Sequence, residues 1–251
     1  MNEPQLENPQ EPERLQTLVE HLGDLRSSLF RSALAILATF FGCFHFAEKI
    51  VSFLKRPIFQ ALPENQKQLY YFGLTEQLYA YMKVSLVAAL LISSPFLFFQ
   101  IWLFVEPALK KKEKRLALPF ILAAFLAFLF GFFVAYQWVL PYLFKFLLTF
   151  SSSGSEMPML GLGEYLSLTL QILLGTALVF EIPVILSLLG RLGIINGAIL
   201  KRFRPQAYIG LSIVAAIVTP TPDAFTMVLA LVPLFLLYEV SVFAVTLLST
   251  K

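Results

Sequence analysis

The most informative candidate for chemistry is Glu181, which lies two residues before Pro183 in the apolar segment VFEIPVIL, residues 179–186. If this segment lies in a membrane, the carboxylate must face a bundle interior or a wet cavity, or be protonated. Pro183 removes one backbone donor and leaves a helix carbonyl unpaired, which adds a polar spot one turn away. Glu181 therefore makes either a functional polar contact or a purely structural hydrogen bond to a Gln or Ser on a neighbouring helix, such as Gln100 or Gln171.

Residues that could perform catalysis are sparse. His21 and His45 are the two histidines and Cys43 is the single cysteine, and none of them stands in a pattern of metal ligands or catalytic partners. One cysteine excludes an internal disulfide, so its expected role is core packing. The sequence therefore predicts no enzymatic activity, no metal and no cofactor.

Two further carboxylates lie in charged segments, Asp24 in HLGDLR and Glu113 in KKKEKR. Taken alone, Glu113 is a solvated acid that relieves repulsion among lysines, and Asp24 is a surface residue that pairs with Arg26 or with lipid headgroups. Taken together at one rim of a bundle, they would suit a partner with two adjacent arginines, because guanidinium groups pair bidentately with carboxylates.

The composition defines the class of protein that must position these residues. Hydrophobic residues make up 58% of the 251 residues and charged residues 14%, and the mean hydropathy is +0.75. These values indicate an all-α polytopic membrane protein with a single domain. The net charge of +3 is small, and no basic stripe interleaved with aromatic residues is present, so the sequence predicts no nucleic-acid binding.

Apolar stretches predict six transmembrane helices with both termini on one side. The stretches are residues 32–47, 84–105, 116–144, 165–190 with Glu181 inside, 205–222 and 224–238. Most lysines and arginines fall on the side of the termini, which the positive-inside rule places in the cytoplasm. The fifth and sixth helices are predicted to be short, because only residues 207–219 separate a basic cluster from the turn TPTPD.

The remaining segments complete the predicted domain organisation. Residues 1–13 are expected to be a disordered cytoplasmic tail, and residues 14–251 a single six-helix domain that begins with an amphipathic helix on the inner leaflet, residues 15–29. Thr75 could N-cap the second helix, and Asp223 is placed to cap the sixth. No internal repeat is visible, which argues against a transporter built on inverted repeats.

Several strings in order resemble the TatC family, the multispanning receptor subunit of the twin-arginine protein translocase. They are HLGDLR, SPFLFFQIWLFVEPAL with KKKEKR, VFEIP, PQAY, TPTPDAF and LYE, spread over residues 18–243. The resemblance implies a cup-shaped six-helix bundle in a prokaryotic inner membrane. It also implies a role in exporting folded proteins with the proton-motive force, without enzymatic activity.

The resemblance also assigns residues. Glu113, Asp24, Arg26 and Phe104 would bind twin-arginine signal peptides at the cytoplasmic face. Pro57 and Asp223 match outer-side positions tied to translocation, and Glu181 with Pro183 matches an intramembrane site for single-span TatA/TatB-type subunits. Membrane lipids and further copies of the chain are other implied partners. Ser28, Ala108 and Met227 depart from the usual family residues, and Asp24 stands where glutamate is usual.

A rival interpretation from another class is an ion-coupled small-solute transporter in which Glu181 is the coupling carboxylate. The sequence argues against this interpretation, because it has one buried acid and no internal repeat on which an alternating-access mechanism could be built. A membrane hydrolase is a third alternative, but it lacks residues to perform the step.

Overall fold

The computed structural model describes residues 18–64, 67–111, 113–151, 159–218 and 224–249, and in these ranges the regular structure is helical. The helices in chain order are α1 Leu18–His45, α2 Ala47–Leu54, α3 Arg56–Ala61, α4 Glu76–Val105, α5 Ala117–Val134, α6 Leu140–Ser151, α7 Leu162–Val179, α8 Glu181–Arg191, α9 Gly197–Arg202, α10 Arg204–Val218 and α11 Ala224–Ser249. The predicted tail 1–13, the TPTPD turn and Asp223 lie outside the described residues.

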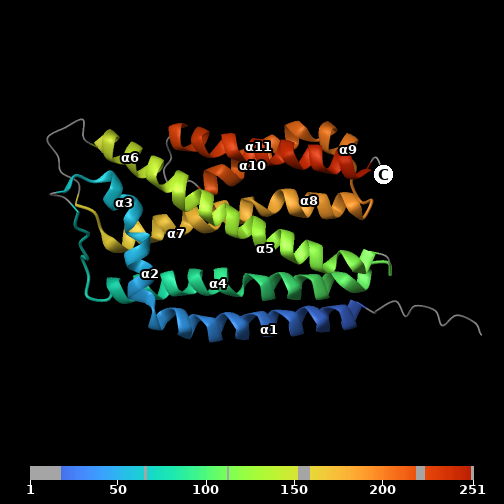
Figure 1. The fold of residues 1–251 in the computed structure, drawn as a ribbon, viewed down its shortest axis with the longest axis horizontal. Helices are drawn as coiled ribbons and strands as arrows, with labels where there is room; N and C mark the ends of the chain where they lie inside the picture. The colour runs from blue at the N-terminus through green and yellow to red at the C-terminus, as the bar shows by residue number, and fades with distance from the viewer. Residues whose placement is uncertain (1–17, 65–66, 112, 152–158, 219–223, 250–251) are drawn as a thin grey trace, which may run out of the picture.

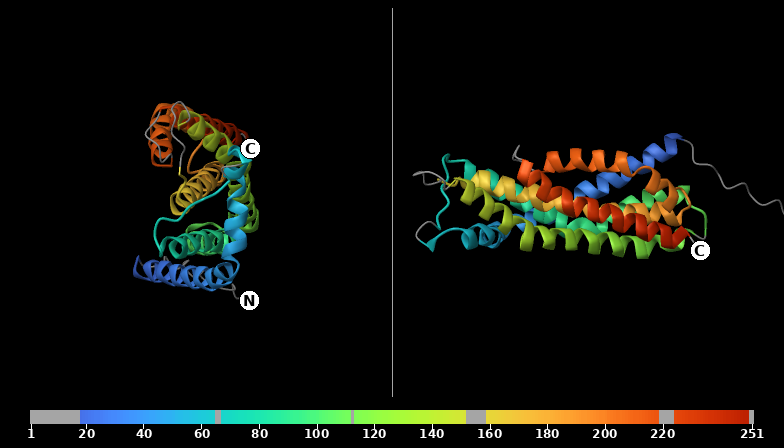
Figure 2. Two further views of the ribbon diagram at one scale, coloured as in Figure 1. Left: turned by 90° about the vertical axis from the view of Figure 1, so that its left-hand side faces the viewer. Right: turned by 90° about the horizontal axis from the view of Figure 1, so that it is seen from above.

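The helices form an elongated bundle with two distinct ends (Figure 1). At one end α1 and α5 begin and α4 and α8 end. We call this the basic end, because it carries Lys110, Lys111, Lys114, Arg115 and Arg191. At the other end the short helices α2 and α3 cross the bundle, and we call it the lid end (Figures 1 and 2).

Neighbouring helices pack in a defined lateral order. Helix α1 lies at one edge and packs against α4, which also contacts α5 and α7. Helix α8 packs against α5 and α11, and α10 packs against α11 at the opposite edge (Figure 2). Six packed segments correspond to the six predicted apolar stretches: α1, α4, α5 with α6, α7 with α8, α10 and α11.

Five helical segments of the described chain are long and apolar enough to cross a membrane. Helix α10 is shorter and is not among these five. It has 15 residues, so it covers about 22 Å of a hydrocarbon core of about 30 Å. The prediction of a short fifth helix is confirmed.

The sixth helix is longer than predicted. The sequence places its end near Tyr238, because the charged Glu239 follows, but α11 has 26 residues and continues to Ser249. The charge does not end the helix, because the Glu239 carboxylate accepts hydrogen bonds from Arg204 and Tyr208. A paired carboxylate can remain within a membrane helix at lower cost than an isolated one.

The first helix joins the predicted amphipathic stretch to the first apolar stretch. Helix α1 contains 28 residues without a break. The amphipathic stretch therefore forms the first turns of the same helix as the first apolar stretch, because no Gly or Pro pair interrupts the backbone ladder at their junction. Cys43 is 6% exposed, which confirms its predicted role in packing.

Two membrane segments are interrupted at points that the sequence explains in part. The fourth segment breaks at Phe180, between α7 and α8, and Pro183 three residues later cannot donate to the carbonyl of Val179. The third segment contains a π-helical turn at Ala135–Val139, which joins α5 to α6. Helices α5 and α7 approach closely at Gly131, because an added Cβ there would lie 2.9 Å from the Ala177 Cα.

Candidate functional site

The first part of the candidate site is the start of α1 at the basic end. Asp24 and Arg26 are both exposed there. Neither forms an ion pair with any described residue, so the expected pairing of Asp24 with Arg26 is absent. The Asp24 carboxylate is thus available to a cationic partner that approaches this end of the bundle.

The second part is the connection between α4 and α5. Phe104 lies half-buried in the last turn of α4, and Glu113 opens the 3₁₀ turn Glu113–Leu116 that leads into α5. Helices α1 and α4 are antiparallel neighbours, so this connection and the start of α1 lie at the same end (Figure 1). The structure therefore brings Asp24, Arg26, Phe104 and the backbone of Glu113 to one end. The Glu113 side chain lies outside the described part.

Sequence reasoning missed a third acid at this end. Glu106 Oε1 lies 3.5 Å from Lys114 Nζ, and the two side chains are 35% and 42% exposed. This ion pair joins the end of α4 to the turn before α5. Glu106 is therefore engaged within the chain, in contrast to Asp24. Its position in the quoted string FVEPAL is the signal that could have found it.

Glu181 lies deep in the bundle at the start of α8. It is 6% exposed, and its Oε1 atom has no hydrogen-bond partner among the described residues. The two glutamines that could explain it structurally do not bind it. Gln100 Oε1 is itself unpartnered, and Gln171 donates instead to the Ile217 carbonyl at 3.1 Å. Neither glutamine therefore supplies the expected hydrogen bond, and Glu181 Oε1 keeps an unmet hydrogen-bonding capacity among the described residues.

Pro57 lies at the opposite, lid end, where it is buried at the start of α3. The lid is tied to the bundle by tyrosine hydroxyls: Tyr136 donates to the Phe53 carbonyl at 2.9 Å, and Tyr165 donates to the Leu54 carbonyl. Pro57 and the residues of the basic end therefore belong to separate sites.

Helix α4 begins directly after Thr75, as predicted, but the Thr75 hydroxyl makes no capping hydrogen bond. The neighbouring Glu76 satisfies backbone donors instead. Its carboxylate accepts from the amides of Phe72 at 2.6 Å, Gly73 at 3.3 Å and Gly163 at 2.8 Å. One side chain thereby joins the segment before α4 to the start of α7.

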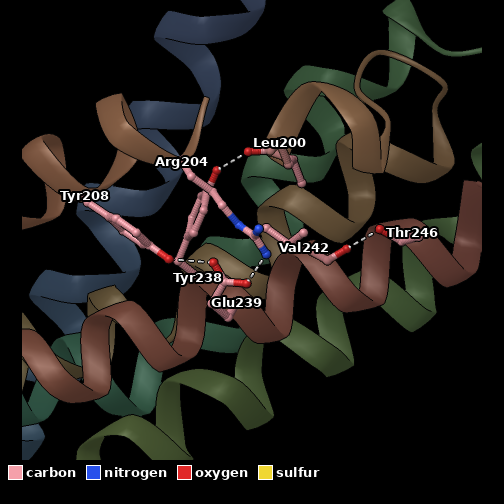
Figure 3. Close-up of polar contacts among 7 residues, drawn as sticks. All are labelled: Leu200, Arg204, Tyr208, Tyr238, Glu239, Val242 and Thr246. Carbon is pink, nitrogen blue, oxygen red and sulfur yellow. Dashed lines mark hydrogen bonds and ion pairs between the residues drawn. The ribbon is translucent and has the colours of Figure 1, made fainter. Parts of the chain in front are cut away.

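A polar cluster between α9, α10 and α11 was also missed (Figure 3). Glu239 accepts hydrogen bonds from Arg204 and, at 2.6 Å, from the Tyr208 hydroxyl. Tyr238 donates to the Leu200 carbonyl at 2.9 Å. The cluster fixes the start of the short α10 to the middle of α11. An acid directly after a long apolar stretch, in the string LYE, was the available signal.

These features define a polytopic α-helical membrane protein with an exposed acid among the basic residues of one end and a buried carboxylate in its core. The sequence model of the family described as Sec-independent protein translocase protein (TatC) matches residues 20–233. The chain belongs to this family.

Individual relatives cover most of the chain. It is 36% identical to the TatC protein of Desulforapulum autotrophicum, over 92% of this chain and 85% of the relative. It is also 36% identical to that of Aquifex aeolicus, over 93% and 96% respectively. A crystal structure of the twin arginine translocase receptor TatC superimposes with a TM-score of 0.81 at 35% identity, covering 92% of this chain and all of that one.

The family assignment confirms the main predictions about class and function. The chain is a multi-pass membrane component of the twin-arginine protein translocase, and the family is not one of enzymes. The transporter and hydrolase alternatives are therefore set aside. The roles of individual residues go beyond what family membership decides.

Proposed function

We propose that the basic end faces the cytoplasm and binds twin-arginine signal peptides, making the chain the receptor subunit of its translocase. The observation that carries the proposal is the exposed Asp24 carboxylate, which has no ion pair among the described residues and lies at the end where Glu113 begins its turn. Phe104 and Arg26 border the same region. Lysine and arginine enrichment at this end supports the cytoplasmic orientation in a prokaryotic inner membrane.

The chemistry of the ligand follows from the charges. Guanidinium groups bind carboxylates through two parallel hydrogen bonds, which ammonium groups cannot do. Glu113 accepts one arginine of the pair and Asp24 the other. The surrounding lysines repel a peptide whose positive charges are placed differently. Because Asp24 is one methylene shorter than the usual glutamate, Glu113 is the stronger contact.

A peptide-binding experiment tests this proposal. The protein in lipid nanodiscs is titrated with a fluorescent peptide that contains Arg-Arg followed by an apolar segment. Replacing both arginines by lysine, or making Glu113→Gln, should weaken binding by about tenfold or more, since a hydrogen bond to a charged group contributes about 1.5–3 kcal/mol. Asp24→Asn should have a smaller effect in the same direction.

The matched control is Glu64→Gln, which removes an acid at the lid end. Glu64 pairs with Lys67 and its side chain is 90% exposed, so the variant changes the net charge equally without touching the proposed site. The basic end would not be the receptor if the dissociation constant of the Glu113→Gln variant stayed within twofold of that of the unmodified chain. An equal loss of affinity in the Glu64→Gln variant would lead to the same conclusion.

Glu181 with Pro183 forms the proposed intramembrane contact for single-span TatA/TatB-type subunits. Its unpartnered Oε1 atom supports this role, because a polar side chain of a partner helix would complete its hydrogen bonding. Glu181→Ala should weaken crosslinks to such subunits while peptide binding stays unchanged. Unaltered crosslinks together with an unfolded variant would assign Glu181 to folding alone.

The remaining proposals concern the assembled translocase. Several copies of the chain act together, and the proton-motive force drives export of the folded passenger. Pro57 at the lid and Asp223, which lies outside the described residues, contribute to translocation on the outer side. Pro57→Leu should reduce export in cells without changing peptide binding, because the lid and the basic end are separate sites.

A further inference from the structure

A groove runs between α5 and α8 at the basic end of the bundle. It has a volume of about 330 Å³, and its walls include Phe120 and Ala123 from α5 and Val184 and Leu188 from α8. Arg191, the last residue of α8, lines the same groove. The walls are thus apolar and the border carries a cation.

The groove is long enough to hold the part of a lipid acyl chain that lies next to the headgroup. It extends from the residue before α5 to Ala123, which corresponds to about 10 Å along a helix. Both α5 and α8 belong to segments that are long and apolar enough to cross the membrane. The groove therefore starts at the membrane border and continues into the hydrocarbon region.

Such a groove does not remain filled with water. Apolar walls offer water few hydrogen bonds, so hydrocarbon chains or a protein segment occupy it. The border charge discriminates between these occupants. Arg191 is exposed and pairs with no carboxylate in the described ranges, and Arg115 just before α5 is likewise exposed and unpaired there. A segment that itself carries two arginines is repelled by this border.

We propose that the groove is a specific site for an anionic phospholipid, with one acyl chain between α5 and α8 and the phosphate on Arg191. Guanidinium groups bind phosphate oxygens bidentately, and basic pockets between transmembrane helices bind acidic headgroups. Ser187 also lies in the groove wall. The site lies at the same end as the proposed peptide receptor but uses none of Asp24, Arg26, Phe104 or Glu113, and it does not depend on the receptor proposal. Its wall shares Pro183 with the proposed contact for single-span subunits.

Photocrosslinking tests the site directly. The full chain is reconstituted into phosphatidylcholine nanodiscs that contain a small fraction of phosphatidylglycerol or phosphatidylcholine bearing a diazirine in the acyl chain. Adducts are mapped by mass spectrometry. Adducts on the groove segments of α5 and α8 should form about fivefold more with phosphatidylglycerol, as one basic residue at a membrane surface favours an anionic lipid by about that factor.

Two variants separate the headgroup from the groove itself. Arg191→Gln should remove the excess of phosphatidylglycerol adducts and leave the phosphatidylcholine yield unchanged. Ala123→Phe fills the groove and should lower the yield from both lipids. The controls are Arg202→Gln and Ala38→Phe, which change exposed residues on α9 and α1, and they should behave like the unmodified chain.

Equal yields from the two lipids, or a phosphatidylglycerol excess that survives Arg191→Gln, would overturn the proposal. A twin-arginine peptide that carries its own diazirine and labels the same groove while suppressing the lipid adducts would overturn it as well, since the groove would then hold the peptide. The melting temperature of each variant is measured in nanodiscs. A variant that loses the adduct but keeps its melting temperature has lost the lipid site and not its fold.

Discussion

The ion pair between Arg204 and Glu239 allows a quantitative test of how the short α10 is held. Glu239→Ala removes the acceptor of two hydrogen bonds, one from Arg204 and one from Tyr208. A hydrogen bond to a charged group contributes about 1.5–3 kcal/mol when it is buried. The Arg204 and Glu239 side chains are 40% and 38% exposed, so solvent screening reduces each contribution to about 1 kcal/mol. The expected loss of unfolding free energy is about 2 kcal/mol.

The measurement is thermal unfolding in detergent, followed by circular dichroism. For a chain of this size, about 2 kcal/mol corresponds to a Tm lower by about 4–8 °C. Glu64→Ala is the control, because it removes a pair whose acid is 90% exposed and should shift the Tm by about 1 °C or less. Arg204→Gln combined with Glu239→Ala should cost about 1 kcal/mol less than the sum of the single changes.

Two outcomes would refute this reasoning. Equal Tm shifts for Glu239→Ala and Glu64→Ala would mean that the cluster in Figure 3 contributes no more than a surface pair. Strict additivity of the Arg204→Gln and Glu239→Ala effects would mean that the two side chains do not interact energetically, whatever their geometry.

Two further predictions concern the lid end and the centre of the bundle. Glu76→Ala should speed hydrogen exchange of the Gly163 amide by about tenfold or more, because this amide loses a charged acceptor. Hydrogen exchange is measured by mass spectrometry, and unchanged protection of Gly163 would contradict the prediction. Gly131→Ala should cost about 1–3 kcal/mol, because its Cβ would lie 2.9 Å from the Ala177 Cα. Gly210→Ala, where nothing lies within 4 Å, is the matched control, and an equal Tm loss for both variants would contradict the close approach.

Local features of the fold could be predicted from the sequence where one residue dominates its own surroundings. Long apolar stretches give the membrane segments, and Pro183 gives the break near Phe180, because its ring and missing amide act within one turn. The start of α4 after Thr75 was predicted as well. The family resemblance rested on short strings of this local kind.

Contacts between distant residues could not be predicted in the same way. Gln171 was expected near Glu181, but it reaches the Ile217 carbonyl, 46 residues away. Glu239 was taken as the border of a helix, because its partner Arg204 stands 35 residues earlier. Whether a charge ends a membrane helix depends on its partner, and the partner is set by packing that a single sequence does not display.

The length of α10 has a consequence for the membrane around the protein. Its exposed side chains Ile209, Ile213 and Ile217 face the lipid, yet the helix is about 8 Å shorter than a typical hydrocarbon core, whereas α1 at the opposite edge has 28 residues and exceeds that thickness. A bilayer of typical thickness would match α10 by thinning locally along this side of the molecule. Elastic deformation of this kind costs a fraction of a kcal/mol per Å of mismatch. Two molecules that placed their thin sides together would share one compressed zone, which would lower the total cost of deformation.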